Sequence, residues 1–193
     1  MYNRLFAHIR RFVPLSAEDE TIIAKFLRFE KRKSKDFLLK TGQVCGSTYF
    51  VAGGCLRMYL VADSGIDQIL QFAINDWWIA DYTSFESQAP SQFTIQALED
   101  TDVIILDKKN QDALLDALPK LERYFRLIVQ RAYSATLMRI HFIYNFSGEE
   151  RYRRFVESFP NFVQRIPQYM LASYLGFTPE FLSKIRGKKD KAY

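Results

Sequence analysis

The residues best suited to chemistry in this sequence lie in one short segment near its C-terminal end. The segment offers two hydroxyls, a carboxylate, a stacking ring and a cation, carried by Thr178, Glu180, Phe181, Ser183 and Lys184. Groups of these types can hydrogen-bond to base edges in the major groove of DNA and to its phosphates. They can act together only if a short helix presents them on one outward face, so the neighbouring residues decide the interpretation.

The flanking residues predict such a helix, preceded by a second helix and a tight turn. Ala172 is small enough to let two helices cross closely, and Gly176 tolerates the positive φ that the turn needs. Thr178 can cap the second helix, and Pro179 suits its first position, where a missing N–H does no harm. Four apolar residues are spaced to lie buried between the helices: Leu171, Leu175, Leu182 and Ile185. The pattern predicts a helix-turn-helix; the alternative is an ordinary helical hairpin at a domain edge.

Positive charge accompanies this predicted helix-turn-helix. Residues 1–118 carry 13 Lys and Arg against 16 Asp and Glu, whereas residues 119–146 carry 5 against 1 and residues 147–193 carry 9 against 5. A module that contacts phosphates would show this asymmetry, although a solvated basic surface would show it too. Besides the residues already named, the expected DNA-binding set includes Gln168, Arg186, Lys188 and Lys189. The lysines would contact phosphates without reading sequence, or would belong to a solvated tail.

The first part of the sequence predicts a helical start followed by a small β domain. Residues 2–13 have apolar residues at helical spacing, and Ser16 with Asp19 predicts a capped second helix that runs to about Arg28. Short apolar segments separated by glycine turns follow, the clearest being a hairpin around Gly53. Several short strands with closely spaced turns favour a jelly roll or a small barrel. A hydrophobic content of 48% supports one or two packed cores.

A long helix is predicted between Pro119 and about Phe146, with apolar residues on more than one side. A small β domain covers only one face of such a helix, so a second face is expected to meet the same helix of another copy in a two-fold dimer. The alternative is a central core helix buried within one chain. The expected dimer interface consists of Leu121, Phe125, Ile128, Ala132, Ala135 and Phe142. The chain is thus predicted to be α+β, with a sensor-like β-roll domain at 1–118, a dimerisation helix at 119–146 and a helix-turn-helix domain at 147–193.

This order of elements resembles the Crp/Fnr family of bacterial transcription regulators over nearly the whole chain. The best local matches are residues 37–42, residues 49–57 and, most specifically, residues 165–186. The resemblance implies an N-terminal jelly roll like a cyclic-nucleotide-binding domain, a long dimerisation helix and a C-terminal helix-turn-helix. It also implies a homodimer that binds palindromic double-stranded promoter DNA and recruits or blocks RNA polymerase.

The sequence departs from the family's pattern in both functional regions. Glu180 and Lys184 match base-reading positions by resemblance, but Pro179 replaces a frequent basic reader, so the DNA sequence preference should differ. Cyclic-nucleotide binders of the family hold the phosphate with a Gly-Glu turn and an Arg-Ser/Thr-Ala segment, and residues 75–82 and 90–94 contain neither. Burying a phosphate without that arginine is strongly unfavourable, so cyclic AMP is expected to bind weakly or not at all.

Aromatic residues gather in the region where the phosphate would be held, namely Trp77, Trp78, Tyr82 and Phe85. They could line an apolar pocket for an unidentified small-molecule effector. They could instead fill the emptied cavity as core, and we favour this second interpretation.

The composition gives little support to other chemistry. Cys45 and Cys55 cannot supply four cluster ligands and are expected as small apolar residues in a reducing cytoplasm. Histidine occurs only at His8 and His141, and a packed or surface histidine is far commoner than a haem ligand. Because paired carboxylates near a histidine, a phosphate loop and metal-ligand spacing are all missing, we expect no enzyme, no metal and no cofactor.

The sequence has no apolar run long enough for a transmembrane helix and no signal peptide, so we expect a cytoplasmic protein without a membrane partner. The alternative function is a ligand-sensing or scaffold domain whose helix-turn-helix contacts a protein. Protein binding of that kind would depend little on salt, whereas DNA binding weakens steeply as salt rises.

Overall fold

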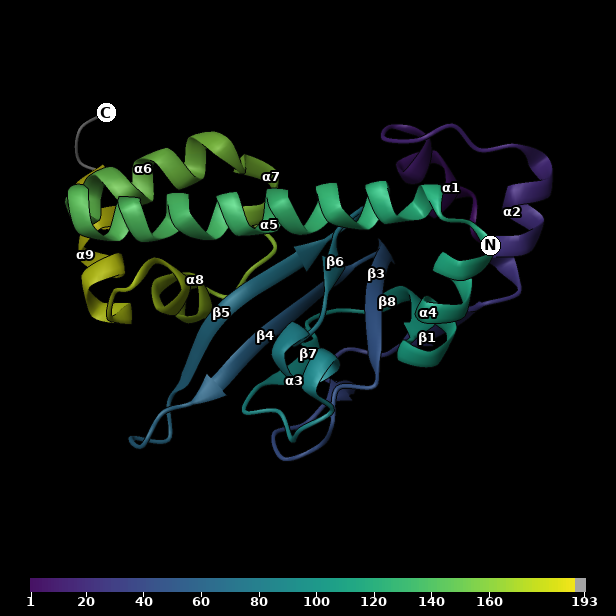
Figure 1. Ribbon diagram of the computed structural model, residues 1–193. Helices are drawn as coiled ribbons and strands as arrows, with labels where there is room; N and C mark the ends of the chain where they lie inside the picture. The colour runs from purple at the N-terminus through teal and green to yellow at the C-terminus, as the bar shows by residue number, and fades with distance from the viewer. Residues whose placement is uncertain (190–193) are drawn as a thin grey trace. The chain divides into compact units, whose positions relative to one another are not determined.

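The computed structural model describes residues 1–189, with side chains to residue 187, and Figure 1 shows its elements. The first elements are α1 (Asn3–Arg10), α2 (Ala17–Ala24), β1 (Leu27–Arg32), β2 (Phe37–Leu39), β3 (Ser47–Gly53), β4 (Cys55–Val61), β5 (Asp67–Ile74), β6 (Trp78–Ile79) and α3 (Tyr82–Ser87). The remaining elements are β7 (Thr94–Ala97), β8 (Thr101–Asp107), α4 (Lys108–Ala117), α5 (Lys120–Asn145), α6 (Gly148–Ser158), α7 (Pro160–Val163), α8 (Gln168–Leu175) and α9 (Pro179–Lys189).

By compactness the chain divides into two units. One unit is Met1–Leu60 with Gln71–Arg131, and the other is Val61–Leu70 with the residues from Ala132 onward. Both β5 and α5 are therefore divided between the units. The three-part functional division proposed from the sequence stays a prediction, because compactness divides the long helix itself.

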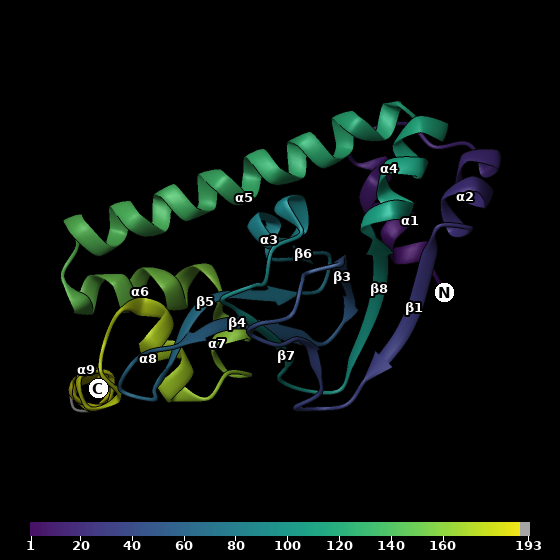
Figure 2. The ribbon, with the colours of Figure 1, turned by 60° about the horizontal axis from the view of Figure 1, so that its bottom comes forward.

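The strands form the predicted jelly roll of two sheets. One sheet has the order β1-β8-β3-β6 and the other has the order β2-β7-β4-β5 (Figure 2). Neighbouring strands are antiparallel in the pairs β1-β8, β3-β8, β2-β7 and β4-β7. The predicted hairpin joins β3 to β4 through Gly54, whose φ is +100°. A Cβ on Gly54 would also meet the backbone of Asp100 and Thr101, so only glycine fits this turn.

The apolar run of β8 is buried on both of its faces. Val103 and Ile105 belong to the core between the two sheets. Ile104 and Leu106 belong to a second cluster, which the sheet forms with helices α1 and α4 and the start of α5. A strand covered on both sides has a continuous apolar sequence instead of an alternating one, which is what these four residues show.

The sequence prediction is wrong at strand β1. It extends the second helix to about Arg28, whereas α2 ends at Ala24 and β1 begins at Leu27. The capping box that starts α2, between Ser16 and Asp19, is present as predicted. Charged residues alternate with apolar ones from residue 27 onward, which is a strand period, and pairing with β8 satisfies the backbone of this segment.

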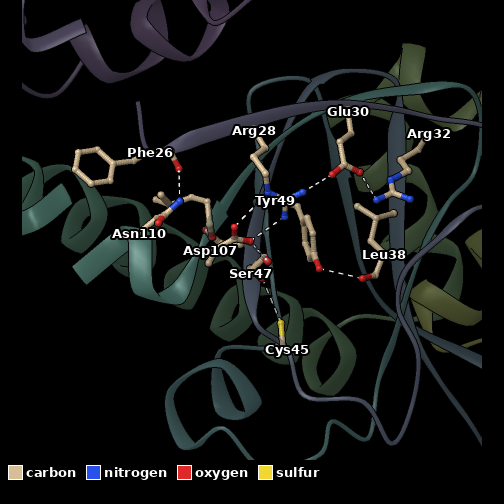
Figure 3. Close-up of polar contacts among 12 residues, drawn as sticks. Phe26, Arg28, Glu30, Arg32, Leu38, Cys45, Ser47, Tyr49, Asp107 and Asn110 are labelled. Carbon is tan, nitrogen blue, oxygen red and sulfur yellow. Dashed lines mark hydrogen bonds and ion pairs between the residues drawn. The ribbon is translucent and has the colours of Figure 1, made fainter. Parts of the chain in front are cut away.

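Charged side chains fasten β1 to its neighbours (Figure 3). Arg28 Nη2 donates to Asp107 on β8 at 2.9 Å, and the hydroxyl of Ser47 on β3 donates to the same carboxylate at 2.7 Å. The Arg28 guanidinium holds the pKa of Asp107 below its usual range. Glu30 pairs with both Arg28 and Arg32. These pairs are partly exposed, so they fix the orientation of β1 more than they add stability.

A buried polar triad attaches the N-terminal helix to α5. The Tyr124 hydroxyl accepts a hydrogen bond from Trp78 Nε1 at 2.7 Å and lies 2.8 Å from His8 Nδ1. Since the hydroxyl accepts from the tryptophan, it can donate to a neutral His8 imidazole, and all the facing polar atoms are then satisfied. Burial lowers the pKa of His8 to about 4. His8 is thus a packed histidine that is neutral at pH 7.

The helices after the jelly roll begin where the sequence predicts. Helix α5 starts at Lys120, directly after Pro119, and α6 starts at Gly148 behind a capping box of Ser147 and Glu150. Within residues 1–189 no helix combines the length and the apolar character that crossing a membrane requires.

Candidate nucleic-acid interface

Helix α8 ends in a turn that requires glycine. Gly176 has a φ of +76° and its N–H donates to the carbonyl of Ser173 at 3.1 Å. The N–H of Phe177 donates to the carbonyl of Ala172 at 2.8 Å. These two bonds close the last carbonyls of the helix as in a Schellman motif, in which the residue at positive φ is usually glycine. The turn predicted at Gly176 is confirmed.

Helix α9 begins with the predicted cap. Its first residue is Pro179, and the side-chain oxygen of Thr178 accepts the N–H of Phe181 at 3.3 Å. The carbonyl of Thr178 accepts the N–H of Leu182 at 3.1 Å, which is the first helical bond. The short turn between Gly176 and Pro179 therefore fixes where α9 starts.

The two helices pack through the apolar residues that the sequence singles out. Ala172 is completely buried, as a close crossing requires. Helices α6 and α7 complete the cluster, whose buried members are Tyr152, Val163, Leu171, Ala172, Leu175, Leu182 and Ile185. The predicted helix-turn-helix geometry is confirmed, and it rests on its own hydrophobic core.

Most of the predicted DNA-binding residues lie on the outside of this arrangement. The exposed ones are Thr178, Glu180, Ser183, Lys184 and Arg186. Hydrogen bonds from the backbone and from the Thr178 hydroxyl lower the pKa of Glu180, so it is anionic at neutral pH. Gln168 is half-buried in the first turn of α8. Lys188 and Lys189 lie outside the residues whose side chains are described.

Phe181 is less free than the sequence suggests. Its ring is 40% exposed and packs edge-on against Phe177, with 5.4 Å between the ring centres. The ring also lies against Gly148 at the start of α6, where a Cβ would collide with it. Only part of the Phe181 ring therefore remains available for stacking.

Arg151 on α6 is a structural residue that the sequence analysis misses. Its Nη1 donates to the carbonyl of Leu175 at 3.1 Å, and its guanidinium lies 4.6 Å from the centre of the Phe177 ring. A cation suits the carbonyl end of a helix, so Arg151 stabilises the turn from the side. Burial lowers its pKa, whereas Arg153 and Arg154 on the same helix are exposed. No motif in the sequence separates the three arginines, because the contact is long-range.

Three residues of the predicted dimer interface, in the first part of α5, lie against the chain's own core. Leu121 is 1% exposed and belongs to the cluster around Tyr124, and Phe125 and Ile128 pack against that cluster. These three residues therefore cover the core of their own chain. Phe142 is half-buried and contacts His141 and Phe146, while the remaining two residues of the set, Ala132 and Ala135, are exposed.

A different face of α5 is apolar and exposed. It follows helical spacing over about four turns and consists of Val129, Tyr133, Leu137, Ile140 and Tyr144. Periodicity shows that a helix has two apolar faces, but it does not show which of them the chain's own core covers. We call these five residues the exposed seam.

Internal hydrogen bonds cap the start of α3, in the region where the resemblance places a phosphate site. The carboxylate of Asp81 accepts the N–H groups of Thr83 and Ser84 at 3.1 and 3.2 Å, which caps α3. The hydroxyl of Ser91 donates to the same carboxylate at 2.7 Å. Both Asp81 and Ser91 are buried. An internal carboxylate therefore occupies the helix start that could otherwise attract an anion.

The four aromatic residues proposed for an effector pocket do not come together. Trp78 lies in the helix-side cluster with Tyr124, and Phe85 lies in the core between the sheets. Trp77 and Tyr82 are exposed, although Tyr82 contacts Phe85 edge-on. The structure therefore contradicts a single pocket lined by all four residues, because neighbouring residues of this segment point into different layers. The favoured interpretation, that the rings are core, holds for Trp78 and Phe85 only.

Cys45 and Cys55 are both buried. Cys45 is part of the core between the sheets, and its thiol donates to the carbonyl of Ser47. Burial raises the pKa of the Cys45 thiol. Such thiols are protonated at neutral pH and are poor nucleophiles.

Comparison with known proteins finds one domain and two regulatory relatives. Residues 29–117, from within β1 to the end of α4, match the cyclic nucleotide-binding domain. The chain is 24% identical over 165 residues to the anaerobic regulatory protein of Haemophilus influenzae and 25% identical over 166 residues to the transcriptional activator protein Anr of Pseudomonas aeruginosa. The alignments cover 80% and 79% of this chain but 63% and 66% of the relatives, so the chain spans less than two thirds of their length.

The structure of FixK2 from Bradyrhizobium japonicum shares the fold of this chain. The TM-score is 0.74 at 14% sequence identity, and the similarity covers 86% of this chain and 85% of FixK2. At that identity the likeness concerns the fold alone.

Proposed function

We propose that this chain is a transcription regulator of the Crp/Fnr type that binds palindromic double-stranded DNA. The proposal rests on the outward face of α9, where Ser183, Lys184 and Arg186 are exposed on a capped helix with its own core. Such a helix can enter the major groove with its polar groups toward the base edges. Lys184 and Arg186 add positive charge for the phosphates.

The protein acts as a homodimer through the exposed seam of α5. Five apolar side chains along one exposed helix face leave a large apolar area in water, and a parallel copy of the same helix would cover it. A two-fold axis along α5 places two reading helices symmetrically, as a palindrome requires. Their separation must be about 34 Å, one turn of DNA.

Regulation does not use cyclic AMP in this proposal. Asp81 and Ser91 satisfy the start of α3 internally, and a phosphate brought there would meet a buried carboxylate instead of an arginine. An unidentified effector of another kind would have to bind elsewhere or displace these contacts. By family resemblance RNA polymerase is a further partner, and the cytoplasm is where the regulator would meet it.

Fluorescence anisotropy with a random pool of short duplexes tests the DNA-binding proposal. Duplexes that bind at low and moderate salt are recovered and sequenced, and we expect a palindrome to be enriched. Lys184→Ala should weaken binding to that palindrome about 10-fold or more, because it removes a cation from the reading helix. Lys109→Ala, at an exposed lysine of α4, is the matched control and should bind as the wild type does.

Equal binding of the palindrome by Lys184→Ala and by the wild type would count against α9 as the helix that reads DNA. The absence of any bound duplex at any salt concentration, together with capture of a protein partner whose binding is insensitive to salt, would count against DNA as the partner. The helix-turn-helix would then serve protein recognition.

A further inference from the structure

The edge of strand β5 is occupied by a side chain of the helix-turn-helix. Strand β5 is last in the order β2-β7-β4-β5, so one side of its backbone has no neighbouring strand in that sheet. An edge of this kind leaves N–H and C=O groups that need partners. The Ser173 hydroxyl of α8 accepts the N–H of Ile69 at 2.9 Å and donates to the carbonyl of Asp67 at 3.1 Å. One hydroxyl thus replaces the two hydrogen bonds that a neighbouring strand would make.

The long helix α5 holds the same stretch of strand from a second direction. The Arg139 guanidinium donates to the carbonyls of Leu70 and Ile69, the latter at 3.4 Å. Its other contact is the ring of Tyr174, the residue after Ser173, with 4.3 Å between guanidinium carbon and ring centre. The edge of β5, helix α5 and helix α8 therefore share one junction, and all of its residues belong to the same compact unit.

The same junction holds α9, the helix proposed to read DNA. Leu171 and Ala172 of α8 are fully buried and pack with Leu182 of α9, so the two helices form one rigid piece. Ser173 and Tyr174 lie on the side of α8 that contacts β5 and α5. The contacts that hold α8 at this junction therefore also determine the orientation of α9.

We propose that Ser173 and Arg139 are positioning residues that latch the helix-turn-helix onto the edge of β5. The inference rests on the proposed DNA-binding function and concerns the orientation of α9, since neither residue lies on its outward face. Both β5 and α5 continue into the other compact unit, so a shift of either element would reach the reading helix through the latch.

The physical effect depends on how many half-sites are bound. A palindrome requires both reading helices at a fixed separation, so a helix-turn-helix without its latch must lose orientational freedom on binding. A single half-site imposes no such separation. Loss of the latch should therefore weaken binding to a palindrome and leave binding to a half-site unchanged.

Ser173→Ala is the first test, measured against the recovered palindrome and against a duplex that contains one half-site. We expect palindrome affinity to fall about 3- to 10-fold, the equivalent of one or two hydrogen bonds, with half-site affinity unchanged. Ser173→Thr keeps the hydroxyl and should restore most of the loss. Ser158→Ala, at an exposed serine of α6 in the same unit, is the matched control and should bind like the wild type.

Arg139→Lys tests the second half of the latch, because lysine keeps the charge but cannot span two carbonyls and a ring. It should reproduce the selective loss of palindrome affinity. Two results would overturn the proposal. One is wild-type palindrome affinity in Ser173→Ala and Arg139→Lys; the other is an equal loss on palindrome and half-site, which would indicate a folding defect of the helix-turn-helix.

Hydrogen exchange separates failure of the latch from failure of the proposed function. The Ile69 amide should exchange slowly in the wild type and much faster in Ser173→Ala. If the wild type binds no DNA, the proposed function falls, and the Ile69 amide still decides whether the latch exists. Fast exchange of this amide in the wild type would refute the latch whatever the DNA result.

Discussion

At the scale of single residues, the surroundings of Gly148 determine where Phe181 lies. A Cβ at this position would collide with the Phe181 ring, which itself packs on Phe177. We expect Gly148→Ala to displace the ring and to destabilise the helix-turn-helix unit by about 1–3 kcal/mol. The free energy of unfolding in urea, followed by circular dichroism, measures the change.

Gly187 is the matched control for that substitution. Among the described residues a Cβ on Gly187 would meet nothing within 4 Å, and this glycine lies inside α9. Gly187→Ala should therefore be neutral or should stabilise by about 0.5–1 kcal/mol, because alanine favours the helix. Equal urea midpoints for Gly148→Ala and the wild type would show that the Phe181 ring is not fixed against Gly148.

At the scale of elements, α5 shows what sequence periodicity decides and what it leaves open. Both apolar faces were foreseeable, because their residues recur at helical spacing. Which of the two faces meets the chain's own core could not be predicted. Leu121, Phe125 and Ile128 look the same in sequence whether the chain's own core or a second copy covers them. The exposed seam is therefore a result of the structure, and it changes which residues a dimer test must use.

Ile140 belongs to the exposed seam, and substituting it tests whether the seam is the dimer interface. Ile140→Glu places a charge in an apolar interface, and we expect it to shift the protein from dimer to monomer at micromolar concentration. Sedimentation velocity measures the change directly. Ser134→Glu, at an exposed position on another side of α5, should leave the dimer intact. A monomeric wild type, or an Ile140→Glu variant as dimeric as the wild type, would exclude the seam as the interface.

The helix-turn-helix was predictable because its constraints are local. Gly176, Thr178 and Pro179 each fit one backbone position, and the buried leucines follow from spacing alone. Strand β1 was missed because its partner β8 lies more than seventy residues away in the sequence, and only that pairing distinguishes a short alternating segment from the end of a helix. The placement of the aromatic residues could not be predicted for a related reason. Trp78 and Phe85 lie in different layers, and only the assembled sheets define these layers.

At the scale of the whole molecule, two continuous elements belong to both compact units. The boundary passes between Leu70 and Gln71 in β5 and between Arg131 and Ala132 in α5. A strand and a helix, each continuous across the boundary, therefore connect the two units, in place of a flexible linker. An effector, if one exists, can act through them only by binding two arrangements with different affinity.

Stability of the folded chain should depend on His8 in a defined pH window. Burial keeps its pKa at about 4, against 6.5 for an ordinary histidine, so the unfolded state binds the proton more readily. The contribution of neutral His8 is complete above pH 6.5 and is lost as pH falls toward 4, by up to about 3 kcal/mol. Urea unfolding between pH 7 and pH 4.5 should therefore show a steeper loss in the wild type than in His8→Gln. Parallel curves for the two proteins would assign the acid sensitivity to other groups.

The hydrogen-bonded carboxylate of Asp81 also limits which sequence changes the chain tolerates. Removing it would leave the Ser91 hydroxyl and the N–H groups at the start of α3 without their partner, at a cost of about 1–3 kcal/mol for each buried group. Selection for stability alone therefore favours a side chain that accepts hydrogen bonds at this position, whether or not the chain binds a ligand there.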